Sequence, residues 1–138
     1  MLLLKLKKNR IVITRGSSMR PFIPCNSRLI ISRNKNPKFG DLLIFRRKNG
    51  RVFAHRVVLI KNKYVLTMGD NVRKPEKVQW YEILGRVTHI ITPDGNVISL
   101  SSFSQRILSI LFALRSLFRI ALLKIRSNNF VLPIYFQK

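Results

Sequence analysis

The sequence predicts a mainly β fold, a compact barrel or folded sheet, followed by one amphipathic helix. Short runs rich in Val, Ile, Leu and Phe recur as far as Leu100. Asn, Gly and Pro separate these runs at intervals of about 8–12 residues, which is typical of small β-barrels and sandwiches. After Leu100 the apolar residues recur at helical spacing instead. The chain has 138 residues, a length that suits one domain.

The apolar runs predict these strands: Arg10–Thr14, Arg28–Ser32, Asp41–Arg46, Val52–Ile60, Tyr64–Met68, Ile83–Thr92 and Val97–Leu100. Turn signals fall where connections are needed, at Asn34–Pro37, Lys48–Gly50, Lys61–Lys63 and Pro93–Asn96. Because Asn, Asp, Gly and Pro favour tight turns, these segments predict hairpin connections between neighbouring strands.

A single helix is predicted from Ser102 to Arg126. Arg115, Arg119 and Arg126 share one face of this helix. The broadly opposite face carries the apolar side chains of Ile107, Leu111, Leu114, Phe118, Leu122 and Ile125. The pattern divides the chain into a β domain over 1–100 and a basic helix with a tail over 101–138.

The predicted helix is too interrupted by charge to cross a bilayer. Its longest uncharged run, Ile107 to Leu114, has eight residues, whereas a spanning helix needs about 20. We therefore expect the helix to lie on a membrane surface, with Arg115, Arg119, Arg126 and Phe118 in contact with it. The alternative is that the apolar face packs on the β domain and the arginines are simply solvated.

The composition is strongly basic. With 27 Lys and Arg against five Asp and Glu, the formal net charge is +22. Each Lys or Arg near an anionic leaflet contributes about 1 kcal/mol of attraction, so the charge favours an anionic membrane as partner. It also fits an alternative of another class, a nucleic-acid-binding β-barrel module in which Phe45, Phe53 and Tyr64 stack on bases.

Cofactors are not indicated by the sequence. A single cysteine excludes an intramolecular disulfide, and two distant histidines with that cysteine do not make a metal site. The sequence also lacks a Walker loop and a dinucleotide-binding fingerprint. Cys25 and His89 are expected to be structural, His89 because it lies in an alternating strand pattern.

The turn around Ser18 has the features of a nucleophile turn. Gly16 precedes the serine and Pro21 follows it, so flexible and rigid backbone positions flank an exposed hydroxyl. A serine nucleophile needs a base to take its proton and a third group to orient that base. His55 and then Asp70 follow along the chain as candidates for these roles.

Five short segments succeed one another in a specific order: Gly16–Pro21, Gly40–Asp41, His55–Val57, Gly69–Asn71 and Leu84–Val87. Their residues resemble the ordered boxes of the type I signal peptidases, over about Ile11 to Ile91. The bacterial and mitochondrial enzymes of that superfamily pair the serine with lysine. The endoplasmic-reticulum and archaeal type carries a His-Arg-Val box, as this chain does.

The resemblance implies a β fold with Ser18 as nucleophile and His55 as general base. It offers two acids, Asp70 in the Gly-Asp-Asn box and Glu76 six positions later, where the family has aspartate. Asp70 is the preferred third member, because the longer side chain of Glu76 displaces its carboxylate. Ser17 is the alternative nucleophile, although the family motif places the reactive serine directly before methionine.

The resemblance also bears on substrate binding. Many signal peptidases carry a serine two residues before the nucleophile, where its hydroxyl helps to stabilise the oxyanion. This chain has Gly16 there, so backbone N–H groups, beginning with that of Ser18, are expected to serve instead. Met19 and Phe22 correspond to apolar residues that line a pocket for small substrate side chains. Packing in the core is the other reading of both residues.

The expected function is removal of a leader from a precursor peptide by a serine endopeptidase. Met1–Leu4 is followed at once by basic residues, so no N-terminal anchor is expected, and the predicted location is the cytoplasmic face of a membrane. A catalytically inactive membrane scaffold of the same fold is the nearest alternative. The self-cleaving repressors of the same superfamily share the Ser-Met turn, but they normally use a lysine base and an attached DNA-binding domain.

Overall fold

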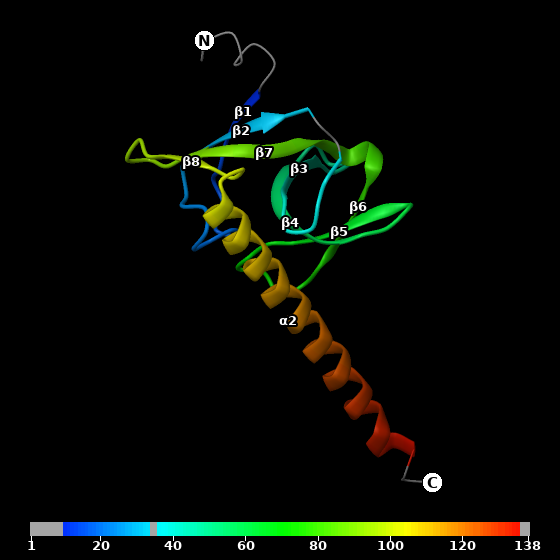
Figure 1. Cartoon of the computed structure of the whole chain (residues 1–138). Helices are drawn as coiled ribbons and strands as arrows, with labels where there is room; N and C mark the ends of the chain where they lie inside the picture. The colour runs from blue at the N-terminus through cyan, green and yellow to red at the C-terminus, as the bar shows by residue number, and fades with distance from the viewer. Residues whose placement is uncertain (1–9, 34–35, 136–138) are drawn as a thin grey trace.

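The computed structural model of the chain describes residues 10–33 and 36–135, with side chains as far as residue 127. Strands and one 3-10 turn precede a single long helix (Figure 1). The strands are β1 Arg10–Ile13, β2 Arg28–Ser32, β3 Leu42–Arg46, β4 Val52–Ile60, β5 Tyr64–Met68, β6 Glu76–Gln79, β7 Ile83–Ile91 and β8 Val97–Ser99. The 3-10 turn is η1 Trp80–Glu82, and the helix is α2 Phe103–Tyr135.

The strands form one antiparallel sheet in the order β1-β2-β7-β3-β4-β5-β6, with β8 paired to β7. The sheet curls on itself, so that β4 and β5 lie below β2 and β7 in Figure 1. Register shifts in three pairs, β2–β7, β3–β7 and β4–β5, accompany this curvature. Bulges bend and twist strands, which allows a small sheet to close part of the way to a barrel.

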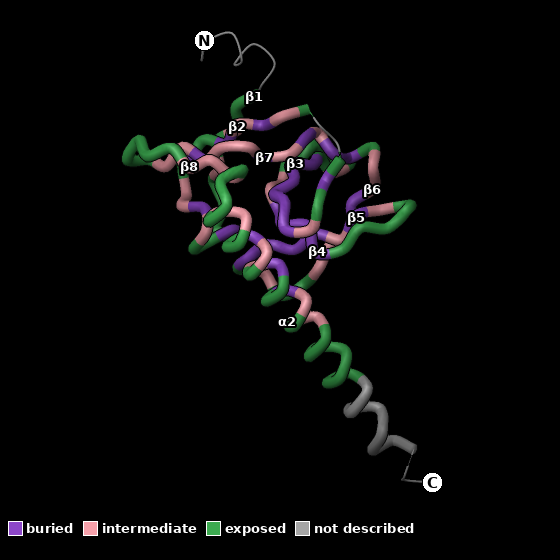
Figure 2. The backbone as a smooth tube through the Cα atoms, viewed as in Figure 1, coloured by how far each residue is buried: buried purple, intermediate pink, exposed green. Residues whose placement is uncertain are grey.

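Strand β3 lies at the centre of the core. Leu42 and Ile44 pack in one buried cluster with residues of β2 and β7, whereas Leu43 and Phe45 pack in a second cluster with residues of β4, β5 and β6. Successive residues of a strand point to opposite faces, so β3 is buried on both faces, as the purple segment of Figure 2 shows. Strand β4, which carries the candidate residue His55, pairs directly with this buried strand.

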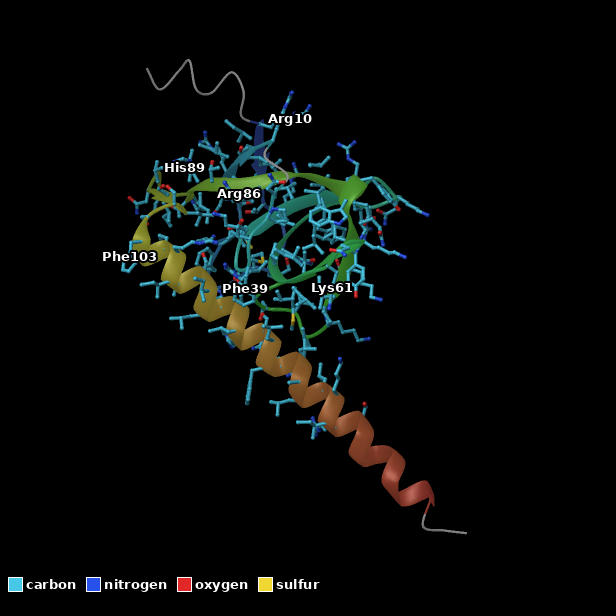
Figure 3. The ribbon with its side chains drawn as sticks, turned by 45° about the vertical axis from the view of Figure 1, so that its right-hand side comes forward. Arg10, Phe39, Lys61, Arg86, His89 and Phe103 are labelled. Atoms are coloured by element: carbon cyan, nitrogen blue, oxygen red, sulfur yellow. The ribbon has the colours of Figure 1, made fainter. Side chains whose placement is uncertain are left out.

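Helix α2 begins beside β8 and crosses the β domain before it extends beyond it (Figure 1). Its first turns contact β4, and Ser109, Ala113 and Ser116 are buried there. Phe103, at the start of α2, projects away from the sheet (Figure 3) and is 82% exposed. No helix among the described residues is long and apolar enough to cross a membrane.

The mainly β fold with a C-terminal helix is confirmed. The predicted strands agree with the structure to within one residue at each end, and the helix runs to Tyr135, past its predicted end at Arg126. Strand β6 was not predicted. The expectations for Met1–Leu4 and for part of the Asn34–Pro37 turn fall outside the described residues.

Candidate active site

A large cleft of about 1150 Å³ opens between the segment after β1 and the first half of β4. The Ser18 turn, His55 and Glu76 all line it. Its other walls are formed mainly by Thr14, Arg15, Gly16 and Ser17 on one side and by Arg51, Val52, Phe53 and Ala54 on the other. Residues far apart in the sequence therefore meet at one concave surface, which is where ligand sites usually lie.

Ser18 lies in a tight turn that is anchored in the core by its neighbour. Met19 is 4% exposed, and its carbonyl accepts a hydrogen bond of 2.9 Å from the N–H of Ile23. The N–H of Arg20 donates to the carbonyl of Ser17 at 3.1 Å. Ser18 itself is half-buried at the cleft wall. The turn thus holds a serine at the cleft with its backbone fixed on both sides.

The turn that follows β5 holds the Ser18 turn in place through hydrogen bonds. The N–H of Asn71 donates to the carbonyl of Ser18 at 2.7 Å, and the side-chain amide of Asn71 donates to the carbonyl of Ser17 at 3.3 Å. A Cβ atom on Gly69 would lie 2.8 Å from the Ser18 carbonyl oxygen and 3.2 Å from Nε2 of His55. Only glycine lets the Ser18 turn and the imidazole converge on this point.

His55 lies on β4 and is 4% exposed. Its ring packs at 5.7 Å from Phe45 and 5.9 Å from Phe53, measured between ring centroids. With Nε2 toward Gly69 and the Ser18 turn, Nδ1 points the other way. Among the described residues Nδ1 is the buried side-chain polar atom that has no hydrogen-bond partner. An unsatisfied buried nitrogen of this kind calls for an explanation, and a catalytic role is one of the recognised ones.

Glu76, at the start of β6, supplies the carboxylate that faces Nδ1. Its Oε2 atom lies 3.7 Å from Nδ1 of His55, too long for a hydrogen bond but within ion-pair distance. The same oxygen accepts a hydrogen bond of 3.1 Å from Arg47, which also binds Glu82. Arg47 therefore holds Glu76 beside the imidazole. Catalytic hydrogen bonds are often long before substrate binds.

Asp70 was the preferred third member of the triad, and the structure places it differently. Its carboxylate is fully buried and accepts two hydrogen bonds of 2.7 Å from the guanidinium of Arg56, at Nε and Nη2. Side chains alternate along β4, so Arg56 faces away from the cleft that His55 lines. Asp70 thus pairs with Arg56, and Glu76 is the acid beside His55.

Burial lowers the pKa of His55 from the usual 6.5, because desolvation disfavours the charged imidazolium. The carboxylates of Glu76 and Asp70 oppose this effect, and the guanidinium of Arg47 adds to it. The net result is an imidazole that stays neutral at physiological pH. A neutral imidazole is the form that can accept a proton from a serine hydroxyl.

Two strand edges along the cleft are open for an extended ligand. The pairing of β4 with β5 begins at Arg56 and Met68, so Val52–His55 has no strand partner on that side within the described residues. Strand β1 pairs with β2 on one side, and no other described strand pairs with it. A peptide in extended conformation could add to either edge through main-chain hydrogen bonds.

The remaining predicted substrate-site residues are divided between two places. Met19 lines the cleft, as a pocket residue should. Phe22 does not: its ring packs edge-to-face against Phe112 of α2 at 5.3 Å and lies 4.4 Å from the guanidinium carbon of Arg56. A Cβ atom on Gly16 would have no neighbour within 4 Å, so the position two residues before Ser18 is open to a side chain.

Helix α2 turns its apolar stripe away from the β domain. We define the outer stripe of α2 as Ile107, Leu111, Leu114, Phe118, Leu122 and Ile125, whose exposed fractions run from 44% to 64%. Arg115 and Arg126 are exposed beside it. Arg119 instead lies half-buried toward the domain, where its guanidinium donates to the carbonyl of Asp70 at 3.4 Å. The alternative that this stripe packs on the β domain is therefore wrong.

The other singled-out residues make structural contacts. His89 is on β7 (Figure 3), a strand that does not line the cleft, and its Nδ1 lies 3.0 Å from the hydroxyl of Thr88. The thiol of Cys25 donates to the carbonyl of Gly16 at 3.3 Å. Phe45 is completely buried, so it cannot stack on a base.

The chain was compared with models of protein families, with curated proteins and with solved structures, and none of the three comparisons finds a match.

Proposed function

We propose that this chain is a serine endopeptidase that removes a leader or signal segment from a precursor peptide, as the resemblance to type I signal peptidases predicts. Ser18 is the nucleophile, His55 the general base and Glu76 the acid that orients His55. One observation carries the proposal: a buried imidazole has its Nδ1 3.7 Å from a carboxylate, and its Nε2 lies beside Gly69, which packs against the carbonyl of Ser18. A nucleophile, a base and an orienting group in this arrangement support acyl transfer by a serine hydrolase, and the resemblance to signal peptidases favours a peptide bond as the substrate.

The reaction follows from these positions. Nε2 of His55 takes the proton of the Ser18 hydroxyl while Oγ attacks the scissile carbonyl carbon. The N–H of Ser18 donates to the oxyanion, and His55 then protonates the leaving amine. Water, deprotonated by His55, hydrolyses the acyl-enzyme and restores Ser18. The carboxylate of Glu76 stabilises the imidazolium that forms in each half of the reaction.

The substrate binds in extended form along the open edges of β1 and β4. Main-chain hydrogen bonds to Val52–His55 supply affinity without demanding particular side chains. Met19 lines the cleft, and the resemblance implies small substrate residues before the cut.

We also propose that the enzyme works as a peripheral protein on the cytoplasmic face of a membrane. The outer stripe of α2 is an exposed apolar surface flanked by Arg115 and Arg126. The net charge of +22 favours the anionic cytoplasmic leaflet. A basic amphipathic helix of this kind lies in the plane of the interface.

The test is cleavage of leader-bearing precursor peptides by the protein on anionic vesicles, read by mass spectrometry. We expect cutting at one site by the wild type and none by Ser18→Ala or His55→Ala. His89→Ala is the matched control and should cut normally, and Ser17→Ala decides between the two neighbouring hydroxyls. Absence of cutting by a folded, vesicle-bound wild type would instead favour a non-catalytic membrane scaffold.

A further inference from the structure

Helix α2 packs against the side of β4 opposite the cleft. Its contact face includes the small residues Ser109, Ala113 and Ser116, which let the helix backbone come close. A Cβ atom on Gly40 would lie 3.3 Å from the backbone carbon and oxygen of Ser109. The helix therefore lies directly against the segment before β3, with no large side chain between them.

Phe112 of α2 reaches the two groups that flank the nucleophile turn. Its ring packs edge-to-face on Phe22, which follows Ser18 by four residues, at 5.3 Å between centroids. The guanidinium carbon of Arg56 lies 5.3 Å from the Phe112 ring and 4.4 Å from the Phe22 ring. Arg56 is fully buried and holds the Asp70 carboxylate. Phe112 thus contacts both the Ser18 loop and the arginine that anchors the Gly69–Asn71 turn.

Arg119 of α2 reaches the Gly69–Asn71 turn itself. Its Nη1 donates to the carbonyl of Asp70 at 3.4 Å. The next residue, Asn71, donates its N–H to the carbonyl of Ser18 at 2.7 Å, and the N–H of Asp70 contacts Sδ of Met19 at 3.4 Å. A chain of direct contacts therefore runs from the helix to the backbone of Ser18.

We propose that Phe112 and Arg119 are positioning residues for the nucleophile, so that α2 completes the active site from behind. The inference rests on the proposed function and adds two residues to its machinery. Phe112 acts on the Ser18 loop through Phe22 and Arg56, and Arg119 acts through the Asp70 carbonyl. Nucleophile and base must be placed to a fraction of an ångström for efficient reaction, so loosening either contact slows catalysis at Ser18.

The experiment uses the full chain in solution with Phe112→Leu and Arg119→Gln. Three quantities are measured: the melting temperature, kcat and KM for a precursor peptide, and the rate at which a fluorophosphonate probe labels Ser18. We expect both variants to lower kcat and the labelling rate about tenfold while KM stays within about twofold. Arg119→Lys keeps a donor within reach of the Asp70 carbonyl and should recover most of the labelling rate.

Two substitutions farther along α2 provide matched controls. Leu123→Ala removes apolar bulk and Lys124→Gln removes a cation, both at exposed positions with no side-chain contact to the turns among the described residues. Both should cleave and label at the wild-type rate. If Phe112→Leu fails to fold, the half-exposed Arg119→Gln decides the question alone.

The outcomes separate this inference from the proposed function. If folded Phe112→Leu and Arg119→Gln label Ser18 and cleave at the wild-type rate, α2 does not position the nucleophile, while the peptidase assignment stands. If the wild type neither cleaves nor labels at Ser18, the peptidase assignment is itself wrong and the role of α2 falls with it.

Discussion

Oε2 of Glu76 lies 3.7 Å from Nδ1 of His55, on the opposite side of the imidazole from Gly69 and the Ser18 turn. Arg47 holds the same oxygen at 3.1 Å, so the carboxylate is fixed although the Glu76 side chain is 36% exposed. In the proposed mechanism this acid favours the tautomer with the proton on Nδ1, which leaves Nε2 free to accept the proton of Ser18.

The first prediction concerns this acid. Glu76→Gln removes the charge that stabilises the imidazolium, and we expect kcat to fall about 100-fold, within the usual range for acid–base groups. The fall in kcat should be smaller for Glu76→Asp, because this variant keeps the negative charge. Glu82→Gln removes the other carboxylate partner of Arg47 without touching His55, and it serves as the control. Wild-type kcat in Glu76→Gln would exclude Glu76 from the mechanism.

The pH dependence tests the environment of His55. Because burial lowers its pKa, the acid limb of kcat/KM should have its midpoint below 6.5. Glu76 raises the pKa of His55, so Glu76→Gln should move the midpoint to still lower pH. Both profiles are measured with one peptide. A midpoint at or above 6.5 in the wild type would contradict a buried imidazole acting as the base.

Substitution of Gly16 by serine should increase the catalytic rate. The space around its Cβ position is empty within 4 Å, so Gly16→Ser fits and places a hydroxyl near the expected oxyanion. One oxyanion donor typically contributes about 10²–10³ in rate, and we expect at least a tenfold rise in kcat. Gly16→Ala adds the same Cβ without the hydroxyl. If both variants raise kcat equally, turn rigidity rather than hydrogen bonding is responsible.

The buried ion pair of Arg56 and Asp70 should matter for stability. Asp70→Asn leaves a guanidinium without its counter-charge in the interior, which typically costs about 3–5 kcal/mol. Asp94→Asn makes the same chemical change on the exposed turn between β7 and β8 and is the control. Thermal unfolding followed by circular dichroism measures both. Equal melting temperatures for the two variants would show that the Arg56–Asp70 pair contributes nothing to thermal stability.

The membrane proposal predicts which side of α2 binds lipid. Phe118→Gln should weaken partition into anionic vesicles about tenfold or more, because burying a large apolar side chain contributes about 1.5–3 kcal/mol. Tyr81→Gln changes a side chain that is 73% exposed outside α2, so its partition should match the wild type. Cosedimentation with anionic and with neutral vesicles measures both. Unchanged binding of Phe118→Gln would remove the outer stripe of α2 from the lipid contact.

Most strands of the sheet were predictable because they are short runs rich in Val, Ile, Leu and Phe that turn residues separate. Strand β6 was not, since Glu76–Gln79 carries one apolar residue, Val78. It is the last strand in the sheet order, and an edge strand needs only one buried side chain to pack. A polar edge strand such as β6 therefore forms by pairing with its neighbour, and its own sequence does not predict it.

The face of α2 that packs on the β domain also could not be predicted from the sequence. The apolar residues of the outer stripe marked a face, but the packed face combines small residues, such as Ser109 and Ala113, with Phe112. Small residues do not stand out as hydrophobic in a sequence, and what they contribute is close approach to a backbone such as that of Gly40. Close packing of small residues therefore helps to decide which side of this helix meets the domain.

Ser18 and His55 were accessible from the sequence, and both line the cleft. The partner of His55 was not, because the longer side chain of Glu76 made Asp70 the preferred acid, whereas the structure pairs Asp70 with Arg56. A signal was present in Arg56: strand alternation points it away from the cleft, and a buried arginine needs a carboxylate. Asp70 fills that need, which leaves Glu76 for His55.

The adjacency of His55 and Arg56 on β4 has a consequence for how the chain tolerates changes in length. Inserting or deleting one residue between Val52 and His55 would exchange the two faces, so that the arginine entered the cleft and the histidine met the helix. The turns at Lys48–Gly50 and Lys61–Lys63 are exposed loop tips outside β4, where insertions are usually tolerated. A tag or an inserted loop can therefore be placed in those turns, whereas the number of residues in β4 has to stay the same.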